Sequence, residues 1–190
     1  MSTGTLIAII VALAVLLILI AVGVWLAMRR RRLQERFGPE YDRTVQTEDS
    51  RHSAERDLRS REQRHQDLDI RQLPAEARAR YAEEWKHAEQ HFVDAPGTSV
   101  DDADRLVTRL MSDRGYPTEG YDQQLRDLSV EHGRTLEHYR AAHDVGIRNR
   151  EGRATTEELR GAMVHYRALF QELLGDRNPR SDRRTRHDAA

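Results

Sequence analysis

The stretch that decides the architecture is LIAIIVALAVLLILIAVGVWLAM at residues 6–28, followed directly by four arginines. It holds 23 residues without a charge and is rich in Leu, Ile, Val and Ala. At a rise of about 1.5 Å per residue, a helix of this length reaches about 35 Å, more than the ~30 Å hydrocarbon core of a bilayer. Trp25 lies near its C-terminal end, where an indole favours the membrane interface. The run therefore predicts one transmembrane helix.

A cleaved signal peptide is the competing interpretation of this N-terminus. Such a peptide has a basic start, an apolar stretch of about 7–15 residues and small residues before the cut. Residues 1–5, Met-Ser-Thr-Gly-Thr, contain no basic side chain, and residues 25–28, Trp-Leu-Ala-Met, do not form a small-residue cleavage site. We therefore expect an uncleaved anchor.

The orientation of the anchor follows from the arginines that abut its C-terminal end, Arg29, Arg30, Arg31 and Arg32. The other flank carries only the α-amino group, so the positive-inside rule places the N-terminus outside and residues 29–190 in the cytoplasm. An extracytoplasmic domain is the alternative. We expect these four arginines and Trp25 to be the membrane-surface residues, because each basic side chain gains about 1 kcal/mol near anionic headgroups.

Charge and composition exclude several classes of function for the rest of the chain. Residues 33–176 hold 30 acidic and 22 basic side chains, a net charge of −8, with no basic patch that could bind nucleic acid. The absence of cysteine excludes disulfides, thiol catalysis and thiolate metal sites. Lys86 is the only lysine beside thirty arginines, a bias typical of a GC-rich bacterial genome.

The segment that follows the anchor is expected to be a charged helical stalk. Residues 29–38 form a basic juxtamembrane segment, and Gly38-Pro39 interrupts the helix that leaves the membrane. Residues 39–73 lack further Gly or Pro until Pro74, and oppositely charged pairs four residues apart, such as Arg51 and Glu55, support a helix there. Disorder of this segment is the alternative.

Residues 74–175 are predicted to form an all-α bundle of about four helices, since no segment alternates like a strand. Helices are expected over 75–93, from a cap at Thr98 or Ser99 to Gly115, over 129–145 after a short piece at 121–128, and over 155–175. Residues 146–153 are expected to be a turn. Thr155 and Glu158 have capping-box spacing and open the most periodic helix. Residues 176–190 are expected to be a disordered basic tail.

Several strings resemble an uncharacterised family of bacterial single-pass membrane proteins, labelled conserved hypothetical or secreted proteins. The strings are RFGPEYDR at 36–43, FVDAP at 92–96, ADRLV at 103–107, RGYP at 114–117, LSVEH at 128–132, HYRAAHD at 138–144 and TEELRGAMVHYRALF at 156–170. The resemblance implies that most of residues 36–174 form one unit of bacterial origin. The resemblance implies no activity, ligand or catalytic residue for this chain.

Two Glu-x-x-His spacings are the weak metal-ligand candidates: Glu62 with His65, and Glu84 with His87. This spacing puts a carboxylate and an imidazole on one helix face, as in carboxylate-bridged di-iron bundles. However, His87 lies roughly 130° from the apolar centre of its helix at ~3.6 residues per turn, so it is expected to point outward. We therefore predict no metal site.

No catalytic motif stands out. The chain has no Gly-x-Ser-x-Gly, no Walker loop and no dinucleotide fingerprint, and we predict no catalytic residue and no cofactor. Two classes of function remain. The first is a membrane-tethered interaction or scaffolding protein with a protein partner in addition to the bilayer. The second is a metal-binding or enzymatic helical bundle that uses Glu and His residues.

Overall fold

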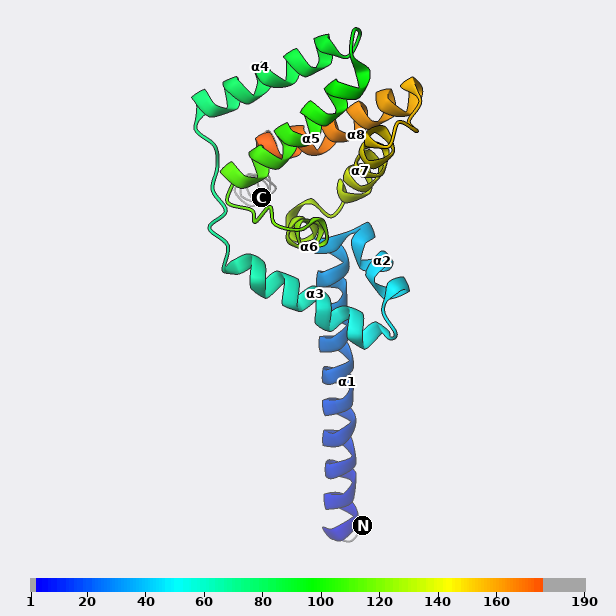
Figure 1. Cartoon of the computed structure of the whole chain (residues 1–190). Helices are drawn as coiled ribbons and strands as arrows, with labels where there is room; N and C mark the ends of the chain where they lie inside the picture. The colour runs from blue at the N-terminus through cyan, green and yellow to red at the C-terminus, as the bar shows by residue number, and fades with distance from the viewer. Residues whose placement is uncertain (1–2, 176–190) are drawn as a thin grey trace, which may run out of the picture. The chain divides into compact units, whose positions relative to one another are not determined.

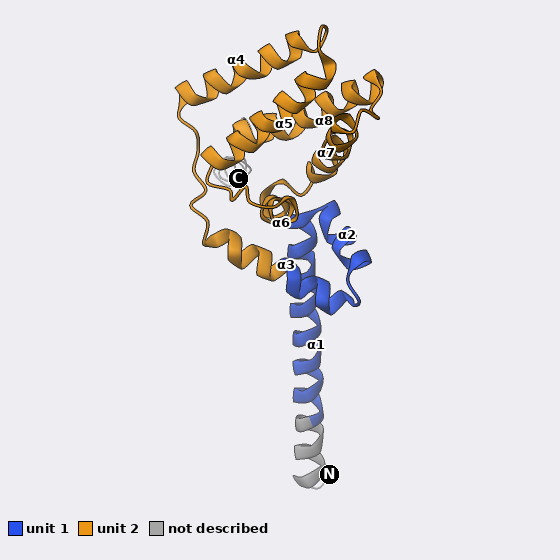
Figure 2. Cartoon of the chain, viewed as in Figure 1, with its two compact units in different colours: residues 1–58 blue, residues 59–190 orange. Residues whose placement is uncertain are grey.

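The computed structural model describes residues 3–175, with side chains described from Ala12 onward, and every regular element in that range is a helix (Figure 1). The predicted all-α fold class is confirmed. The chain divides into two compact units, unit 1 at residues 1–58 and unit 2 at residues 59–190 (Figure 2). Residues 1–2 of the predicted N-terminal end at 1–5, and the predicted tail at 176–190, lie outside the described residues.

Helix α1, Thr3–Phe37, continues without a break from the apolar run through the four arginines. Its stretch from Ala12 to Phe37 is long and apolar enough to cross a membrane, and none of its most apolar window is buried. An apolar helix without a packed side is the pattern of a membrane span. The structure therefore contains one helix near the N-terminus that is long and apolar enough to span a membrane, where the apolar run predicted it.

Unit 1 is completed by α2, Pro39–Thr47, and the first part of α3, Arg51–Gln66. Gly38 has φ 54°, a backbone conformation that suits glycine, and turns the chain so that α2 packs beside α1. The small core of this unit is fully or almost fully buried and consists of Leu33, Phe37, Tyr41, Ala54 and Leu58. The segment predicted as an exposed stalk thus buries one apolar stripe.

The charged segment is two helices rather than one, which corrects the expected stalk over residues 39–73. Glu48 is extended, with φ −90° and ψ 150°, and the Oγ of Ser50 accepts a hydrogen bond from the N–H of Ser53 at 3.1 Å. Ser53 in turn donates its hydroxyl to Glu48 at 2.7 Å. Short polar side chains that bond the local backbone end one helix and cap the next, which is why the chain turns here without Gly or Pro.

Unit 2 is built on five helices after the end of α3: α4 (Ala75–His91), α5 (Pro96–Asp113), α6 (Tyr121–His132), α7 (Leu136–Arg150) and α8 (Thr156–Leu174). Helix α8 packs against α5 and α7, and α4 covers α5 (Figure 1). Trp85 stacks on Phe170 with ring centroids 4.6 Å apart at the centre of this core. The expected number of about four helices is corrected to five within the described residues.

Three expected helix limits differ from the structure. Helix α5 begins at Pro96 and not after a cap at Thr98 or Ser99; proline suits the first turn of a helix. Helix α6 runs through residue 128, where a break was expected, because Leu128 and Val130 are both buried on it. Helix α7 continues past Gly146 to Arg150, where a turn was expected.

Gly146 is inside α7 for a packing reason. A Cβ at this position would lie 3.4 Å from the hydroxyl oxygen of Tyr166 on α8. The Tyr166 hydroxyl needs that space because it donates to the Oδ1 of Asp104 at 2.8 Å. The missing side chain therefore allows α7 and α8 to approach each other. From the sequence alone, the same glycine predicted the end of a helix.

A connecting segment after α3 runs past the end of α5. The N–H of Arg71 donates to the carbonyl of Arg114 at 2.9 Å. At Gly115, φ is 91° and a Cβ would lie 2.1 Å from the carbonyl oxygen of Asp69. Only glycine fits there, so Gly115 both ends the helix and admits the connecting segment.

Candidate functional site

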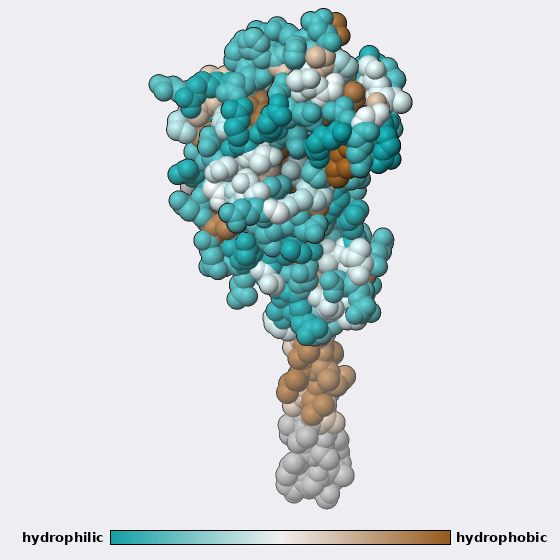
Figure 3. Space-filling view, in the orientation of Figure 1, coloured by the Kyte–Doolittle hydropathy of each residue, from teal (hydrophilic) through white to brown (hydrophobic). Residues whose placement is uncertain are grey.

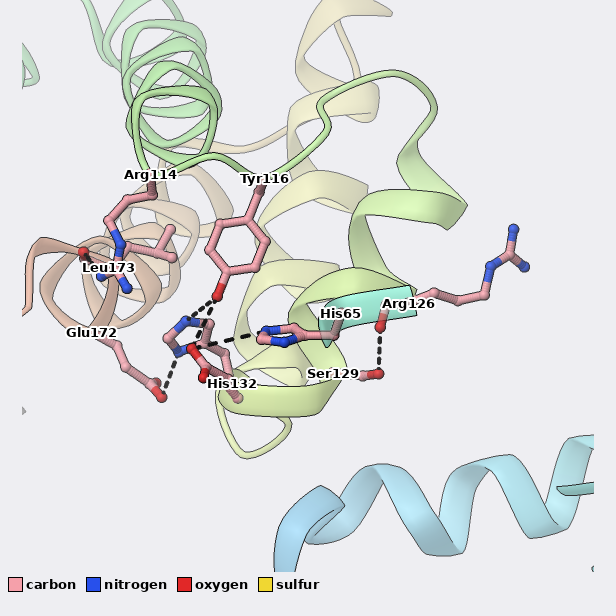
Figure 4. Close-up of polar contacts among 9 residues, drawn as sticks. His65, Arg114, Tyr116, Arg126, Ser129, His132, Glu172 and Leu173 are labelled. Atoms are coloured by element: carbon pink, nitrogen blue, oxygen red, sulfur yellow. Dashed lines mark hydrogen bonds and ion pairs between the residues drawn. The ribbon is translucent and has the colours of Figure 1, made fainter. Parts of the chain in front are cut away.

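The candidate site is a buried polar network in unit 2 that joins four segments far apart in sequence (Figure 4). Tyr116 comes from the loop between α5 and α6, His132 from the last turn of α6, and His65 from the end of α3. Their side chains are almost completely buried, with 2%, 6% and 8% exposed. Glu131 of α6 and Glu172 of α8 supply the carboxylates, each 29% exposed.

The network is a chain of hydrogen bonds centred on His132. Its Nδ1 lies 2.9 Å from Oε1 of Glu172, and its Nε2 lies 3.2 Å from the hydroxyl oxygen of Tyr116. Tyr116 donates to Oε2 of Glu131 at 3.3 Å, and Thr135 donates to Glu172. Two carboxylates, an imidazole and a phenol are therefore connected, and the buried side chains of Tyr116 and His132 both have hydrogen-bond partners.

Tyr116 stays protonated in this setting. Burial raises the pKa of its phenol well above the usual range, and the neighbouring Glu131 carboxylate raises it further. The coulombic effect of Arg114 lowers that pKa, but by less than burial raises it. Tyr116 therefore acts as a fixed hydrogen-bond donor and is not suited to give up its proton as a general acid.

His65 brings α3 to the same network. Its Nε2 lies 3.9 Å from Oε2 of Glu131, and its ring meets Tyr116 edge-on with centroids 6.1 Å apart. The neighbouring residue Arg64 donates from its Nε to Oδ1 of Asp127 at 3.0 Å. Asp127 lies one turn before Glu131 on α6. The end of α3 is thus fastened to α6 by polar contacts of consecutive residues.

Asp127 is the least solvated charged group in this contact, with 1% of its side chain exposed. Its Oδ1 accepts from Arg64 and also from the Nε2 of Gln123 at 2.9 Å, whereas Arg64 itself is half exposed. A buried carboxylate that loses its partner bears its full desolvation cost. The Arg64–Asp127 pair therefore ties the end of α3 to α6.

These contacts hold the end of α3, helices α6 and α8, and the loop between α5 and α6 together. No group of three or more His, Cys, Asp or Glu side chains within the described part of the chain is arranged to hold a metal ion. A cavity of about 320 Å³ lies elsewhere, between α4 and α5. Its lining is Arg80, Tyr81, Glu84, Arg109, Ser112 and Asp113.

The structure separates the two Glu-x-x-His pairs predicted as weak metal candidates. Glu84 forms an ion pair with Arg109, 2.5 Å between Oε2 and Nη2, and His87 is exposed one turn further along α4. His65 instead enters the polar network, whereas Glu62 remains half buried on α3. The two pairs belong to different helices, and the structure gathers neither into a set of metal ligands.

The predicted membrane-surface residues lie together on α1. The guanidinium of Arg29 lies over the Trp25 ring at 5.0 Å from its centroid, a cation–π contact that suits an interface. Arg29, Arg31 and Arg32 are exposed, and Arg30 is half buried. The basic end of the apolar helix is therefore open to headgroups on most of its circumference.

Sequence reasoning missed the network of Tyr116, His132 and Glu172. The only local signal is that Glu172 lies in the final turn of α8, a helix whose buried positions carry no charge. Nothing in the spacing of residues 40 positions apart indicates that they meet.

No protein-family model, no curated protein and no solved structure matches this chain. The resemblance suggested by strings such as RFGPEYDR and RGYP therefore stays a prediction.

Proposed function

We propose that this chain is a membrane-anchored interaction module whose helical domain works at the cytoplasmic face of a bacterial membrane. The observation that carries the proposal is the exposure of the apolar side chains of α1. Leu17 and Leu19 are 65% and 63% exposed, and the apolar surface around them is continuous (Figure 3). An apolar surface of this size, on a stretch of helix with no packed side, needs a lipid environment.

Continuity of α1 supports retention of the anchor. The same helix that carries the apolar run also carries Leu33 and Phe37, which are buried in the core of unit 1. A cut near Met28 would fall inside this helix. The anchor and unit 1 are therefore built as one structural piece.

The orientation is tested with C-terminal fusions. Arg29 to Arg32 favour a cytoplasmic domain by the positive-inside rule. A fluorescent-protein fusion at residue 190 should fluoresce, and an alkaline phosphatase fusion there should be inactive. Active phosphatase with no fluorescence would reverse the orientation and restore the secreted interpretation.

An interaction role is supported by tethering and by the surface of α3. Anchoring raises the effective concentration of the domain toward other membrane components without any catalytic group. Because the apolar stripe of α2 and α3 is used inside unit 1, the outward face of α3 is polar. The exposed residues of α3 include His52, Arg56, Ser60 and Gln63.

Co-purification from membranes tests this surface. The triple variant His52→Ala/Arg56→Ala/Gln63→Ala removes exposed side chains of α3 and leaves the buried stripe intact. The matched control is Glu83→Ala/Lys86→Ala/Gln90→Ala on the exposed face of α4. The α3 triple should lose a partner that the α4 triple keeps, and the opposite result would move the interaction surface to the bundle.

The competing metal or enzymatic class has its own test. Elemental analysis of the purified full chain is compared with that of the Glu84→Ala/His87→Ala variant and of His65→Ala. The interaction proposal expects no stoichiometric metal in any of them. Stoichiometric iron, manganese or zinc that is lost in one of the variants would overturn it.

A further inference from the structure

Two histidines from different helices meet nitrogen to nitrogen at the surface of unit 2. His138 lies in the first turn of α7, and His165 lies near the middle of α8. Their Nδ1 atoms are 2.9 Å apart and their ring centroids are 5.1 Å apart, with 27° between the ring planes. His138 is exposed and His165 is half buried, so the pair is open to solvent.

The packing of α7 against α8 sets the positions of the two histidines (Figure 1). Each histidine directly precedes a buried tyrosine, Tyr139 on α7 and Tyr166 on α8, with 1% and 0% exposed. The two phenol rings meet edge-on in the core with centroids 6.2 Å apart. Tyr139 also donates to Oε1 of Gln124 at 3.0 Å, and Tyr166 donates to Oδ1 of Asp104 at 2.8 Å. The backbone beside each imidazole is therefore held by the core.

The spacing of the pair matches two ligands of one metal ion. Imidazole nitrogens bind zinc at about 2.0–2.1 Å, so two of them lie about 2.9 Å apart at a right angle and about 3.3 Å apart in a tetrahedron. The observed Nδ1 separation is 2.9 Å. In a tetrahedral site the two ring centroids lie about 5 Å apart, and the observed separation is 5.1 Å. A metal ion therefore fits after a small turn of the rings.

The hydrogen between the two rings does not block a metal. One Nδ1 donates and the other accepts in the metal-free pair, because two lone pairs or two N–H groups would repel each other. When a metal binds, this hydrogen moves through water to Nε2 of the same ring, and both Nδ1 lone pairs turn to the metal. Both rings then remain neutral imidazoles, which is the form that binds metal.

We propose that His138 and His165 form a two-histidine site for a divalent transition metal ion, of the class of Zn²⁺, Ni²⁺ and Cu²⁺. Neighbours on the same helix faces are small: Ala141 on α7, and Gly161 and Ala168 on α8. A Cβ at Gly161 would meet nothing within 4 Å. Water therefore has room to fill the remaining coordination positions.

The site is expected to exchange its metal with solution. Two protein ligands are fewer than the three or four that hold the zinc of catalytic and structural sites. A chelator used during purification should therefore empty it, and binding should appear when metal is added. Both histidines belong to unit 2, so the site goes beyond the proposed interaction role and does not depend on the membrane anchor.

Titration calorimetry of the full chain in detergent micelles tests the site with Zn²⁺ and Ni²⁺ as probes. The background chain carries His87→Gln/His91→Gln, because these exposed histidines lie four residues apart on α4 and would compete for added metal. One ion should bind per chain. His138→Gln or His165→Gln should weaken binding at least about tenfold, since a direct ligand matters no less than an outer-shell partner. No binding in the background chain, or unchanged binding in both variants, would overturn the proposal.

Electron paramagnetic resonance of one equivalent of Cu²⁺ counts the nitrogen ligands directly. The background chain should show two bound imidazoles, and His138→Gln should show one. In calorimetry, the double variant His138→Gln/His165→Gln should lose about as much affinity as either single variant, because one imidazole cannot chelate. Equal nitrogen counts with and without His138 would contradict a shared site.

Thermal unfolding by circular dichroism adds a readout that a structural hydrogen bond would not give. A metal that joins α7 to α8 binds only the folded bundle, so added Zn²⁺ should raise the melting temperature of the background chain. The rise should be lost in His138→Gln and kept in His52→Gln, a matched change of an exposed histidine on α3. An equal rise in His138→Gln would place the metal elsewhere and overturn the proposal.

Discussion

Helices α1 and α8 are the two apolar helices of this chain, and they differ in how apolar residues are distributed around the axis. In α8 they follow a stripe that is buried in the bundle: Leu159, Ala162, Met163, Tyr166, Leu169, Phe170 and Leu173. In α1 they surround the helix from 13 to 28 and are exposed throughout the described part. One-sided apolarity needs a protein partner, whereas all-round apolarity needs lipid.

The largest difference is expected when one apolar side chain is truncated in each helix. Phe170→Ala removes the ring that stacks on Trp85 and should lower the free energy of unfolding by about 3–5 kcal/mol. Leu17→Ala on α1 removes no buried contact of the protein and should leave that free energy unchanged. Denaturant unfolding of the full chain in micelles, followed by tryptophan fluorescence, measures both.

Val164→Ala is the matched control within α8, because Val164 points away from the stripe and is 63% exposed. It should change the free energy of unfolding by less than about 0.5 kcal/mol. A loss at Val164 equal to that at Phe170 would show that the buried stripe does not hold α8 in place.

When a charge is placed on each helix, the larger effect is expected in α1 and the smaller one in α8. Leu17→Arg near the centre of the span should cost about 2.5–3.5 kcal/mol of insertion free energy and shift protein from the membrane pellet to the supernatant after alkaline extraction. Val164→Arg on the exposed side of α8 should remain in the pellet like the wild type. Complete retention of Leu17→Arg would contradict a membrane span at this position.

Removal of the cap of α8 should have a smaller effect. The predicted capping box is confirmed: Glu158 N–H donates to Oγ1 of Thr155 at 3.3 Å, and Thr155 N–H donates to Oε2 of Glu158 at 2.8 Å. Thr155→Ala should destabilise the bundle by about 1 kcal/mol, and Thr155→Ser should restore most of the loss. Thermal unfolding by circular dichroism measures this change. Equal melting temperatures of the Ala and Ser variants would show that the Thr155 cap does not stabilise the bundle.

The smallest expected effect is a dependence of bundle stability on pH that the apolar stretch of α1 cannot share, since residues 6–28 contain no ionisable side chain. Burial lowers the pKa of His143 below its usual 6.5, and Arg150 lowers it further, whereas Asp104 and Asp144 oppose the shift. The unfolded chain therefore takes up the proton first as the pH falls. Stability present above pH 6.5 is lost as the pH falls through the pKa of the folded state.

His143→Gln should flatten this part of the pH profile of the melting temperature. The ring of His143 stacks on Tyr121 with centroids 3.9 Å apart, so a uniform loss at all pH values is expected from the lost stacking. The informative measurement is therefore the slope between neutral and mildly acidic pH. An unchanged slope in the variant would assign the pH dependence to other groups.

Local patterns predicted much of the fold. The span, the break at Gly38-Pro39 and the cap at Thr155 each depend on residues within a few positions of one another, and each is where it was expected. The predicted break near residue 128 and the predicted stop at Gly146 were wrong, because burial against other helices decided both. The break at residues 48–50 was also missed, because there short polar side chains that bond nearby groups end one helix and cap the next without Gly or Pro.

The sequence by itself determined that one helix is apolar on all sides and that the rest forms a thin-cored helical protein, because residue type and periodicity follow from nearest neighbours. Only the tertiary structure decided that α2 folds back along α1, and that His65, Tyr116, His132 and Glu172 share one buried network. These contacts join positions many residues apart, and packing and hydrogen bonding across helices choose them. No local pattern encodes such a choice.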